Sequence, residues 1–243
     1  MLSALSLGAT LYMPATRPDL WQVVNGEKYP ELRSLVICLE DAVSEHEVEA
    51  AKVNLKHLLQ QVQDQPRQAQ HPKIFIRPRH IAMAEELAQW PELIMADGMV
   101  LPKFCLNQLR QWQQILPDFI QVMPTLEDAE AFDMGAMREL RQALQQDFRQ
   151  VLVLRIGGND LLNCLAVRRP SDLTLYQTPI GALIANLAGQ FLPYGFALSA
   201  PVCEHFTQVK LLQDELYLDL QHGLSGKTII HPAQIAIVHQ AYQ

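Results

Sequence analysis

The stretch V-L-V-L-R-I-G-G-N-D-L-L, residues 151–162, decides the fold assignment. It begins as an apolar run typical of a buried strand, breaks at a Gly-Gly pair and then presents Asn159 and Asp160. In parallel α/β proteins, side chains just beyond the carboxyl ends of the strands contact the substrate. The only basic residue beside Asp160 in this stretch is Arg155. Two interpretations of Asp160 therefore stay open: it caps a helix that starts at Leu161, or it belongs to a functional site.

Similar strand-like runs recur along the chain, and helix-like segments with apolar residues at helical spacing separate them. The predicted strands are Ala9–Met13, Ser34–Leu39, Lys73–Ile76, Gly98–Leu101, Phe119–Met123, Val151–Ile156, Phe196–Ser199 and Lys227–Ile230. Eight strands that alternate with helices predict an α/β protein of the (β/α)8 TIM-barrel type. The length of 243 residues suits one such barrel, and no linker composition interrupts it. We therefore expect residues 1–243 to form a single domain.

Composition excludes several classes of protein. The net charge is −7 and no basic run stands out, so the electrostatic footprint of a nucleic-acid-binding protein is missing. The four cysteines are scattered without metal-site or disulfide spacing, which predicts a reduced, cytoplasmic protein. Residues 180–203 carry no charge, but Pro193 and Gly195 interrupt them, so we expect a buried helix, a turn and a strand and no membrane span.

Charged side chains follow most of the predicted strands. If the barrel is correct, all of them gather at the end that carries the active site in this fold. Carboxylates crowded together repel one another unless they are protonated, paired or bridged by a cation, and Mg²⁺ suits such a site. An arginine can grip a substrate carboxylate or phosphate through two parallel hydrogen bonds. The gathered residues are Arg17, Glu40, Asp41, Arg77, Lys103, Glu127 and Asp160.

This set predicts a metal-assisted carbon–carbon lyase, because a metal facing a carbonyl oxygen stabilises the enolate that develops during aldol or Claisen-type cleavage. Two alternatives to these residue roles remain open. Asp128 and Glu130 lie close enough in sequence to replace Glu127 as a ligand. Lys103 could instead form a Schiff base, which would require a desolvated amine.

Short motifs add a resemblance to a known family. Leu11–Asp19 (L-Y-M-P-A-T-R-P-D), Leu39–Val43 (L-E-D-A-V), Ile76–Arg79 (I-R-P-R), Val100–Lys103 (V-L-P-K) and Gly226–Ile235 (G-K-T-I-I-H-P-A-Q-I) resemble the citrate lyase beta-subunit family of aldolases and lyases, in the same order. The run G-G-N-D-L-L is similar to a branch of that family, the TIM-barrel C–C bond lyases, which is associated with tellurium-resistance gene clusters.

The resemblance implies a Mg²⁺-dependent barrel, often a homotrimer, that acts on a small carboxylate such as a 2-oxo acid or hydroxy acid, or on its acyl-CoA thioester. By position it implies that Glu127 and Asp160 are the metal ligands and that Arg77 holds the substrate oxygens. Glu40 and Asp41 resemble the acidic pair that orients metal-bound water. Arg17 and Lys103 are expected beside the substrate.

The chain departs from the family pattern at residues 124–130, where P-T-L-E-D-A-E replaces the usual I-E-T-A-R-G. Longer family members also continue beyond the I-H-P-A-Q-I motif. Two further functions therefore stay open. The protein could be an acyl-CoA thioesterase or synthase that uses the same metal site, or a non-catalytic, metal-binding regulatory relative.

Overall fold

The structure is a computed structural model that describes residues 2–65, 67–148 and 150–243. Within these residues, eight parallel strands form one sheet in the order β7-β6-β5-β4-β3-β2-β1-β8, which confirms the predicted TIM barrel. The strands are β1 (Ala9–Pro14), β2 (Ser34–Cys38), β3 (Lys73–Arg77), β4 (Gly98–Leu101), β5 (Gln121–Leu126), β6 (Leu154–Ile156), β7 (Leu198–Ser199) and β8 (Lys227–Ile229).

The two outer strands of this order, β7 and β8, nearly close the barrel. The N–H of Ala200, just after β7, donates to the carbonyl of Gly226 at 2.8 Å, and the N–H of Thr228 donates to the carbonyl of Ala200 at 3.1 Å. Ala200 and Lys227 also form an isolated parallel bridge. These contacts join the two ends of the strand order, and the pairing of β1 with β8 joins the first and last parts of the chain.

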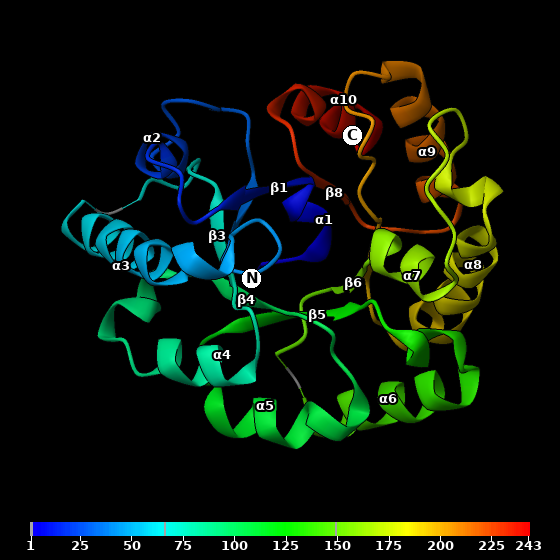
Figure 1. The fold of residues 1–243 in the computed structure, drawn as a ribbon, viewed down its shortest axis with the longest axis horizontal. Coiled ribbons are helices and arrows are strands. Elements are labelled where there is room, and N and C mark those ends of the chain that lie inside the picture. Colours follow the sequence, from blue (N-terminus) through cyan, green and yellow to red (C-terminus); the bar gives the residue numbers. More distant parts are fainter. Residues whose placement is uncertain (1, 66, 149) are drawn as a thin grey trace.

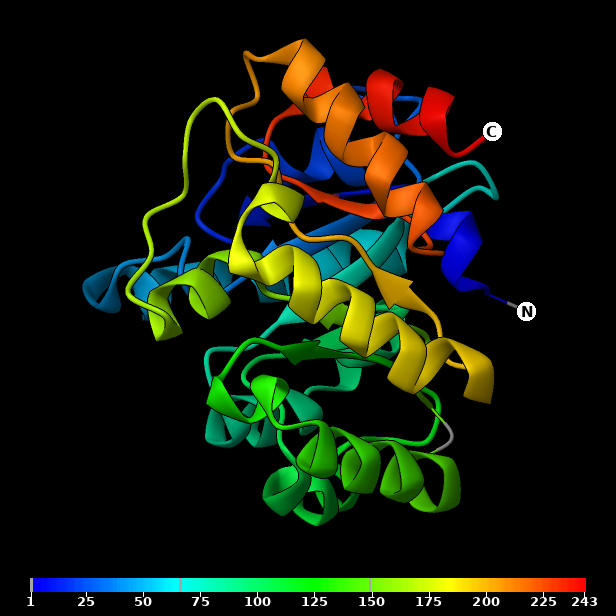
Figure 2. The ribbon, with the colours of Figure 1, turned by 90° about the vertical axis from the view of Figure 1, so that its right-hand side faces the viewer.

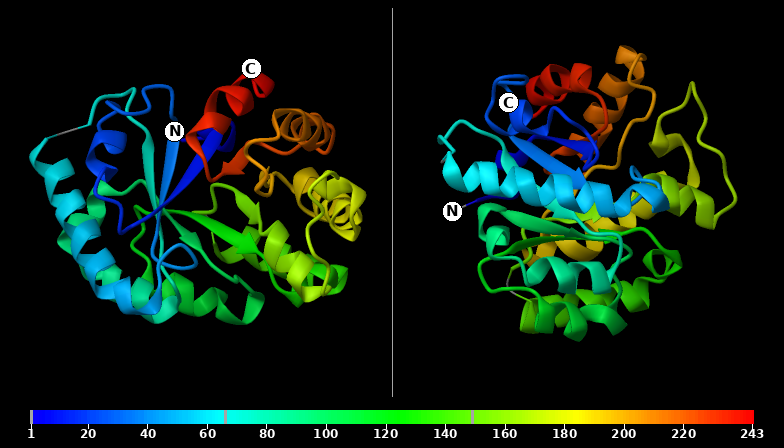
Figure 3. Two further views of the ribbon diagram at one scale, coloured as in Figure 1. Left: turned by 45° about the horizontal axis from the view of Figure 1, so that its top comes forward. Right: turned by 60° about the vertical axis from the view of Figure 1, so that its left-hand side comes forward.

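The longer helices lie around the outside of the ring of strands (Figure 1, and Figure 3 from two further directions). On α3, Leu55, Leu58, Leu59 and Val62 are buried at the three-to-four-residue spacing that places them on one helix face. They join the main apolar core between the sheet and the helices. The helices are α1 (Ala4–Leu7), α2 (Leu20–Val24), α3 (Val48–Asp64), α4 (Ile81–Ala88), α5 (Leu109–Ile115), α6 (Met134–Asp147), α7 (Gly158–Cys164), α8 (Pro179–Phe191), α9 (Val209–Gln221) and α10 (Ile235–Ala241).

A second, smaller apolar cluster fills the inside of the barrel. It consists of Leu7 from α1 and of inward-facing residues of the strands: Val36, Phe75, Val100, Met123 and Val153. The hydroxyl of Ser34, in the first position of β2, donates to the carbonyl of Leu7 at 3.0 Å, so α1 covers the amino-terminal ends of the strands. Figure 2 shows α1 at one end of the barrel and the segment 165–178, in yellow-green, projecting at the other.

The bounds of β5 and β6 differ from the sequence prediction. β5 runs on through Pro124 to Leu126, and β6 is continuous only from Leu154. The two strands pair at Val122–Val151 and again at Thr125–Arg155, so β5 advances three residues while β6 advances four. This is a bulge, and it lies opposite a proline that has no N–H to donate to the ladder.

The uncharged segment at residues 180–203 folds as α8, a turn and β7, as predicted. In the parts of the chain that the structure describes, no helix is long and apolar enough to cross a membrane.

Candidate active site

A polar layer lies directly above the apolar interior of the barrel. Because side chains alternate in direction along a strand, the residue two positions after each buried apolar residue faces inward again. Arg77 follows Phe75 in this way, Thr125 follows Met123, and Arg155 follows Val153. These three side chains line a cavity of about 240 Å³, together with Asp41, Glu127 and Asp160 from the ends of β2, β5 and β6.

Arg77 is the centre of the charge network. Its guanidinium forms ion pairs with Glu40, with Glu127 at 3.1 Å and with Asp41 at 3.7 Å. The Arg77 side chain is only 10% exposed. Burial alone would lower its pKa, but Glu127, Tyr12 and Glu40 outweigh burial, so the pKa of Arg77 lies above its usual range. Arg77 is therefore a permanent cation beside the cavity.

Glu127 is 3% exposed and is held in one orientation. Its Oε1 accepts the backbone N–H of Lys103 at 2.7 Å and the guanidinium of Arg77 at 3.1 Å. Gly157 makes this position possible, because a Cβ on Gly157 would lie 2.4 Å from the Glu127 Cβ and 2.7 Å from its Oε2. The first glycine of the Gly-Gly pair thus leaves space for the carboxylate.

The helix-cap interpretation of Asp160 is wrong. Helix α7 begins at Gly158, with Gly157 in the cap position, so Asp160 is the third helical residue and not the cap. It lines the cavity next to Gly158 and Asn159. Arg155 is not its counter-charge either, because the cations that act on the pKa of Asp160 are Arg77 and Lys103.

The carboxylates of the site raise one another's pKa. Burial is the largest cause for Glu127 and for Asp160, and the charge of Asp41 raises both pKa values further. Burial also raises the pKa of Glu40 to about 7, although Arg77 opposes the shift. Ionising several buried carboxyl groups close together is costly, and a bound cation stabilises such a site by offsetting their negative charge.

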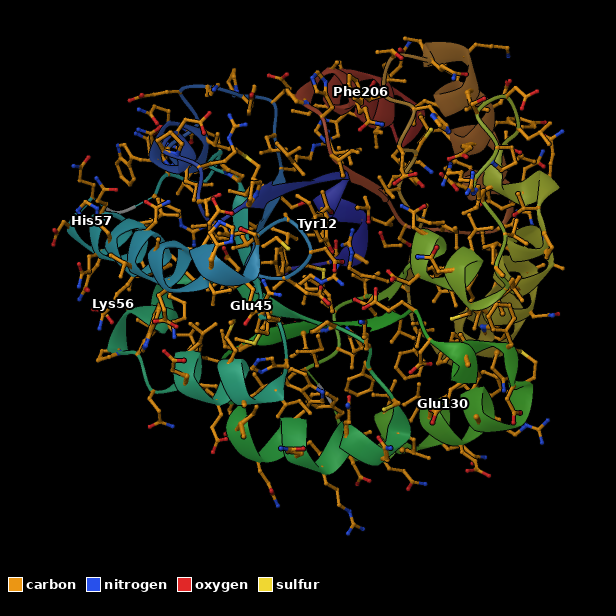
Figure 4. All side chains as sticks on the ribbon, in the orientation of Figure 1. Tyr12, Glu45, Lys56, His57, Glu130 and Phe206 are labelled. Carbon is orange, nitrogen blue, oxygen red and sulfur yellow. The ribbon has the colours of Figure 1, made fainter. Side chains whose placement is uncertain are left out.

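The alternatives to Glu127 lie elsewhere. Asp128 is a helix cap whose carboxylate accepts the N–H of Glu130 at 3.0 Å, and neither residue lines the cavity. Figure 4 shows Glu130 towards the periphery and Tyr12 near the middle of the molecule. The structure thus brings Glu127, and neither of its neighbours, to Asp160 and Arg77.

Lys103 and Arg17 do not line the cavity. Lys103 is exposed, so the desolvation that a Schiff-base lysine needs is missing. Its contact with the site is through its backbone, which adopts a left-handed conformation (φ 45°) and donates its N–H to Glu127. Arg17 donates two hydrogen bonds to Asp19, at 2.7 and 2.6 Å, and its side chain is 43% exposed.

The residues present fit a Mg²⁺ ion. Within the described residues, no group of three or more His, Cys, Asp and Glu side chains is arranged to hold a metal. A cation beside Glu127 and Asp160 would therefore complete its coordination with water and substrate oxygens, as Mg²⁺ commonly does. The buried Oδ1 of Asn159, which lines the same cavity, has no hydrogen-bond partner in the described structure and would be available as a further oxygen ligand.

Comparison with known proteins assigns the chain to a family. Over residues 1–243, the sequence matches the model of a family described as C–C bond lyases of the TIM-barrel fold. The chain belongs to this family. No curated protein matches its sequence significantly.

Solved structures with a similar fold include the citrate lyase beta subunit. That subunit from Mycobacterium tuberculosis, complexed with oxaloacetate and magnesium, is 20% identical over 100% of both chains with a TM-score of 0.73. RipC from Yersinia pestis is 18% identical over 99% of this chain and 97% of its own, also with a TM-score of 0.73. A lead(II) complex of Haloferax volcanii malate synthase is 13% identical over 100% of this chain and 75% of its own, with a TM-score of 0.81. At these identities the likeness shows the fold.

Sequence reasoning overlooked part of the cavity of this C–C bond lyase family member. Tyr12, Arg155 and Thr228 line it, from β1, β6 and β8. Arg155 carried a usable signal, because a charged residue within the apolar run V-L-V-L-R-I is expensive to bury. Tyr12 and Thr228 carried none, since tyrosine and threonine are ordinary strand residues.

Proposed function

We propose that the protein is a Mg²⁺-dependent carbon–carbon lyase that cleaves a hydroxy acid, a 2-oxo acid or a related thioester. The observation that carries this proposal is the convergence of Arg77, Asp41, Glu127 and Asp160 in one cavity at the carboxyl ends of the strands. Solved structures of similar fold are described with magnesium and oxaloacetate, or with magnesium, acetoacetate and coenzyme A. Both support a site for small carboxylates.

Glu127 and Asp160 would hold the cation. When bound, Mg²⁺ would supply positive charge that stabilises the oxyanion developing as the carbon–carbon bond breaks. The backbone N–H of Lys103 and the guanidinium of Arg77 keep the Glu127 carboxylate in place before substrate arrives. Such preorganisation means that little rearrangement is needed during the reaction.

Arg77 would bind the substrate carboxylate, with Glu40 as a positioning residue. Glu40 pairs with Nε of Arg77, and Glu127 and Asp41 pair with its Nη2. Among the described residues, Nη1 is therefore the guanidinium nitrogen that is left for a ligand. Asp41 lines the cavity, and its side chain is 70% exposed. It is therefore placed to exchange a proton between substrate and solvent.

A calorimetric titration with Mg²⁺ tests the metal site. Glu127→Gln and Asp160→Asn are expected to lose binding by tenfold or more, since each removes a charged ligand. Asp128→Asn is the matched control, because it changes a neighbouring acid outside the cavity and should bind as the parent does. Parent-like binding by both site variants would refute the assignment.

Release of 2-oxo acids from panels of hydroxy acids and hydroxyacyl-CoA thioesters tests the reaction. A second candidate is activity on acyl-CoA, which the groove beside the cavity favours: it has about 540 Å³ and is lined by Arg168 and Arg169. However, Arg169 is already paired with Glu215 at 2.5 Å. Intact Mg²⁺ binding with no turnover on any panel would favour the regulatory alternative.

A further inference from the structure

Arg155 reaches across the inside of the barrel at the floor of the cavity. It starts from β6, is 2% exposed and donates to the Thr228 hydroxyl of β8 at 2.6 Å. It also contacts the Met123 sulfur of β5 at 3.4 Å, and its guanidinium lies 5.3 Å from the ring of Tyr12 in β1. Its contacts therefore come from several sides of the barrel, at the level where the apolar interior ends.

Among the described residues, no carboxylate pairs with the charge of Arg155. Among the described residues, its hydrogen-bond partners are an uncharged hydroxyl and a thioether, and its Nε has no partner. Burial lowers the pKa of Arg155; the hydroxyl of Tyr12, which is not a carboxylate, opposes this shift, and the neighbouring cation Arg77 lowers the pKa further. By contrast, buried Lys227 and Arg169 each contact a carboxylate, at 2.9 and 2.5 Å. A buried charge without a partner is strongly disfavoured unless a ligand compensates it.

A second unpartnered atom lies in the same polar layer. The Thr125 hydroxyl is buried and has no hydrogen-bond partner in the described structure. Thr125 pairs directly with Arg155 in the β5–β6 ladder, and both residues line the cavity. The floor thus combines an uncompensated guanidinium with a free hydroxyl donor, which is a suitable set for an oxyanion.

We propose that Arg155 and Thr125 bind a second anionic group of the substrate, and that this group is a carboxylate. The inference rests on the proposed function: one end of the acid would lie at Arg77 and the cation, and the other at Arg155. The substrate would then be a short hydroxy or oxo diacid. The cavity of about 240 Å³ supports a short molecule, because sites for drug-sized ligands measure about 300–1,000 Å³.

Malate and 2-hydroxybutyrate form a matched pair of probes, since the second differs by a methyl group in place of the terminal carboxylate. With saturating Mg²⁺, we expect calorimetry to show malate binding to the parent protein about tenfold more tightly or better. In Arg155→Gln this preference should fall to about one, while 2-hydroxybutyrate and Mg²⁺ bind as before. An unchanged preference in Arg155→Gln would overturn the proposal.

The parent protein alone separates two failures. If it binds both acids equally, the floor subsite is refuted and the lyase proposal stands. If it binds neither acid with Mg²⁺ present, the floor subsite is refuted, and the Mg²⁺ titration and the hydroxyacyl-CoA panel decide the lyase proposal separately. Inorganic phosphate is the third probe, with sulfate as its control. If phosphate displaces malate at a lower concentration than sulfate does, the floor binds a phosphate group and the carboxylate proposal is refuted.

Arg155→Met distinguishes ligand binding from a structural role. Methionine fills similar space without charge, so we expect the ligand-free variant to unfold at the same urea concentration as the parent or a higher one. If Arg155 instead served only to hold Thr228 and Tyr12 together, the variant would unfold at a lower concentration and the parent would show no preference for malate. That combination would overturn the proposal.

Discussion

Gly157→Ala tests whether the Gly-Gly break exists to seat Glu127. The new Cβ would lie 2.4 Å from the Glu127 Cβ, where ordinary contacts begin at 3.4 Å, so one of the two must move by about 1 Å. Rotation of the carboxyl group cannot relieve this clash, because the Glu127 Cβ is fixed to its backbone. The 2.7 Å bond from the Lys103 N–H and the 3.1 Å contact with Arg77 would both be strained.

A displacement of this size predicts a specific loss. We expect Mg²⁺ affinity to fall by about 10- to 100-fold, as when the support of a metal ligand is removed. Any lyase turnover should fall by about 100-fold, because misplacement by 1 Å has that effect. Overpacking should also cost about 1–3 kcal/mol of unfolding free energy. Calorimetry with Mg²⁺ and urea denaturation measure these quantities.

Gly189→Ala is the matched control. Apart from its chain neighbours and the backbone of α8 itself, no atom lies within 4 Å of the Cβ that the alanine would add, so this variant should bind Mg²⁺ as the parent does. It should also gain about 0.5–1 kcal/mol of stability, because glycine weakens a helix. If Gly157→Ala binds Mg²⁺ with parent affinity, Glu127 is not a ligand and the argument from Gly157 is refuted.

Three further outcomes are expected. Burial raises the pKa of Glu40 from 4.5 to about 7, so between these values the folded chain keeps a proton that the unfolded chain releases. The free energy of unfolding therefore falls as pH rises through this window, by at most about 3 kcal/mol. Urea denaturation at pH 5 and pH 7.5 should show this fall, and Glu40→Gln should reduce it. Arg77→Lys keeps the charge but cannot contact Glu40 and Glu127 together, so oxalate binding with Mg²⁺ should weaken by at least tenfold in calorimetry; parent-like affinity would contradict the role of the guanidinium. Lys227→Met removes the lysine shared by buried Asp219 and Glu215, and denaturation should show a loss of about 3–5 kcal/mol of unfolding free energy. A second change, Asp219→Leu, should restore most of it, because Glu215 keeps Arg169 as a partner. A smaller loss in Lys227→Met would mean that these ion pairs add little.

The sequence by itself determined the barrel and most of the residues at its carboxyl end. Strand runs that alternate with helices admit few topologies, and the rule that strand ends share one face brought Asp41, Arg77, Glu127 and Asp160 together in advance. Its errors were local. The bulge opposite Pro124 shortened β6, and the start of α7 at Gly158 removed the cap interpretation of Asp160.

Only the tertiary structure decided which charges meet. Arg155 lies five residues from Asp160 in sequence, yet its side chain crosses the barrel to Thr228, because a strand residue two positions after inward-facing Val153 must also face inward. Lys103 acts through a backbone N–H, and Gly157 through the side chain that it lacks. Residue types along the chain carry neither kind of information, since both depend on how closely distant backbones approach.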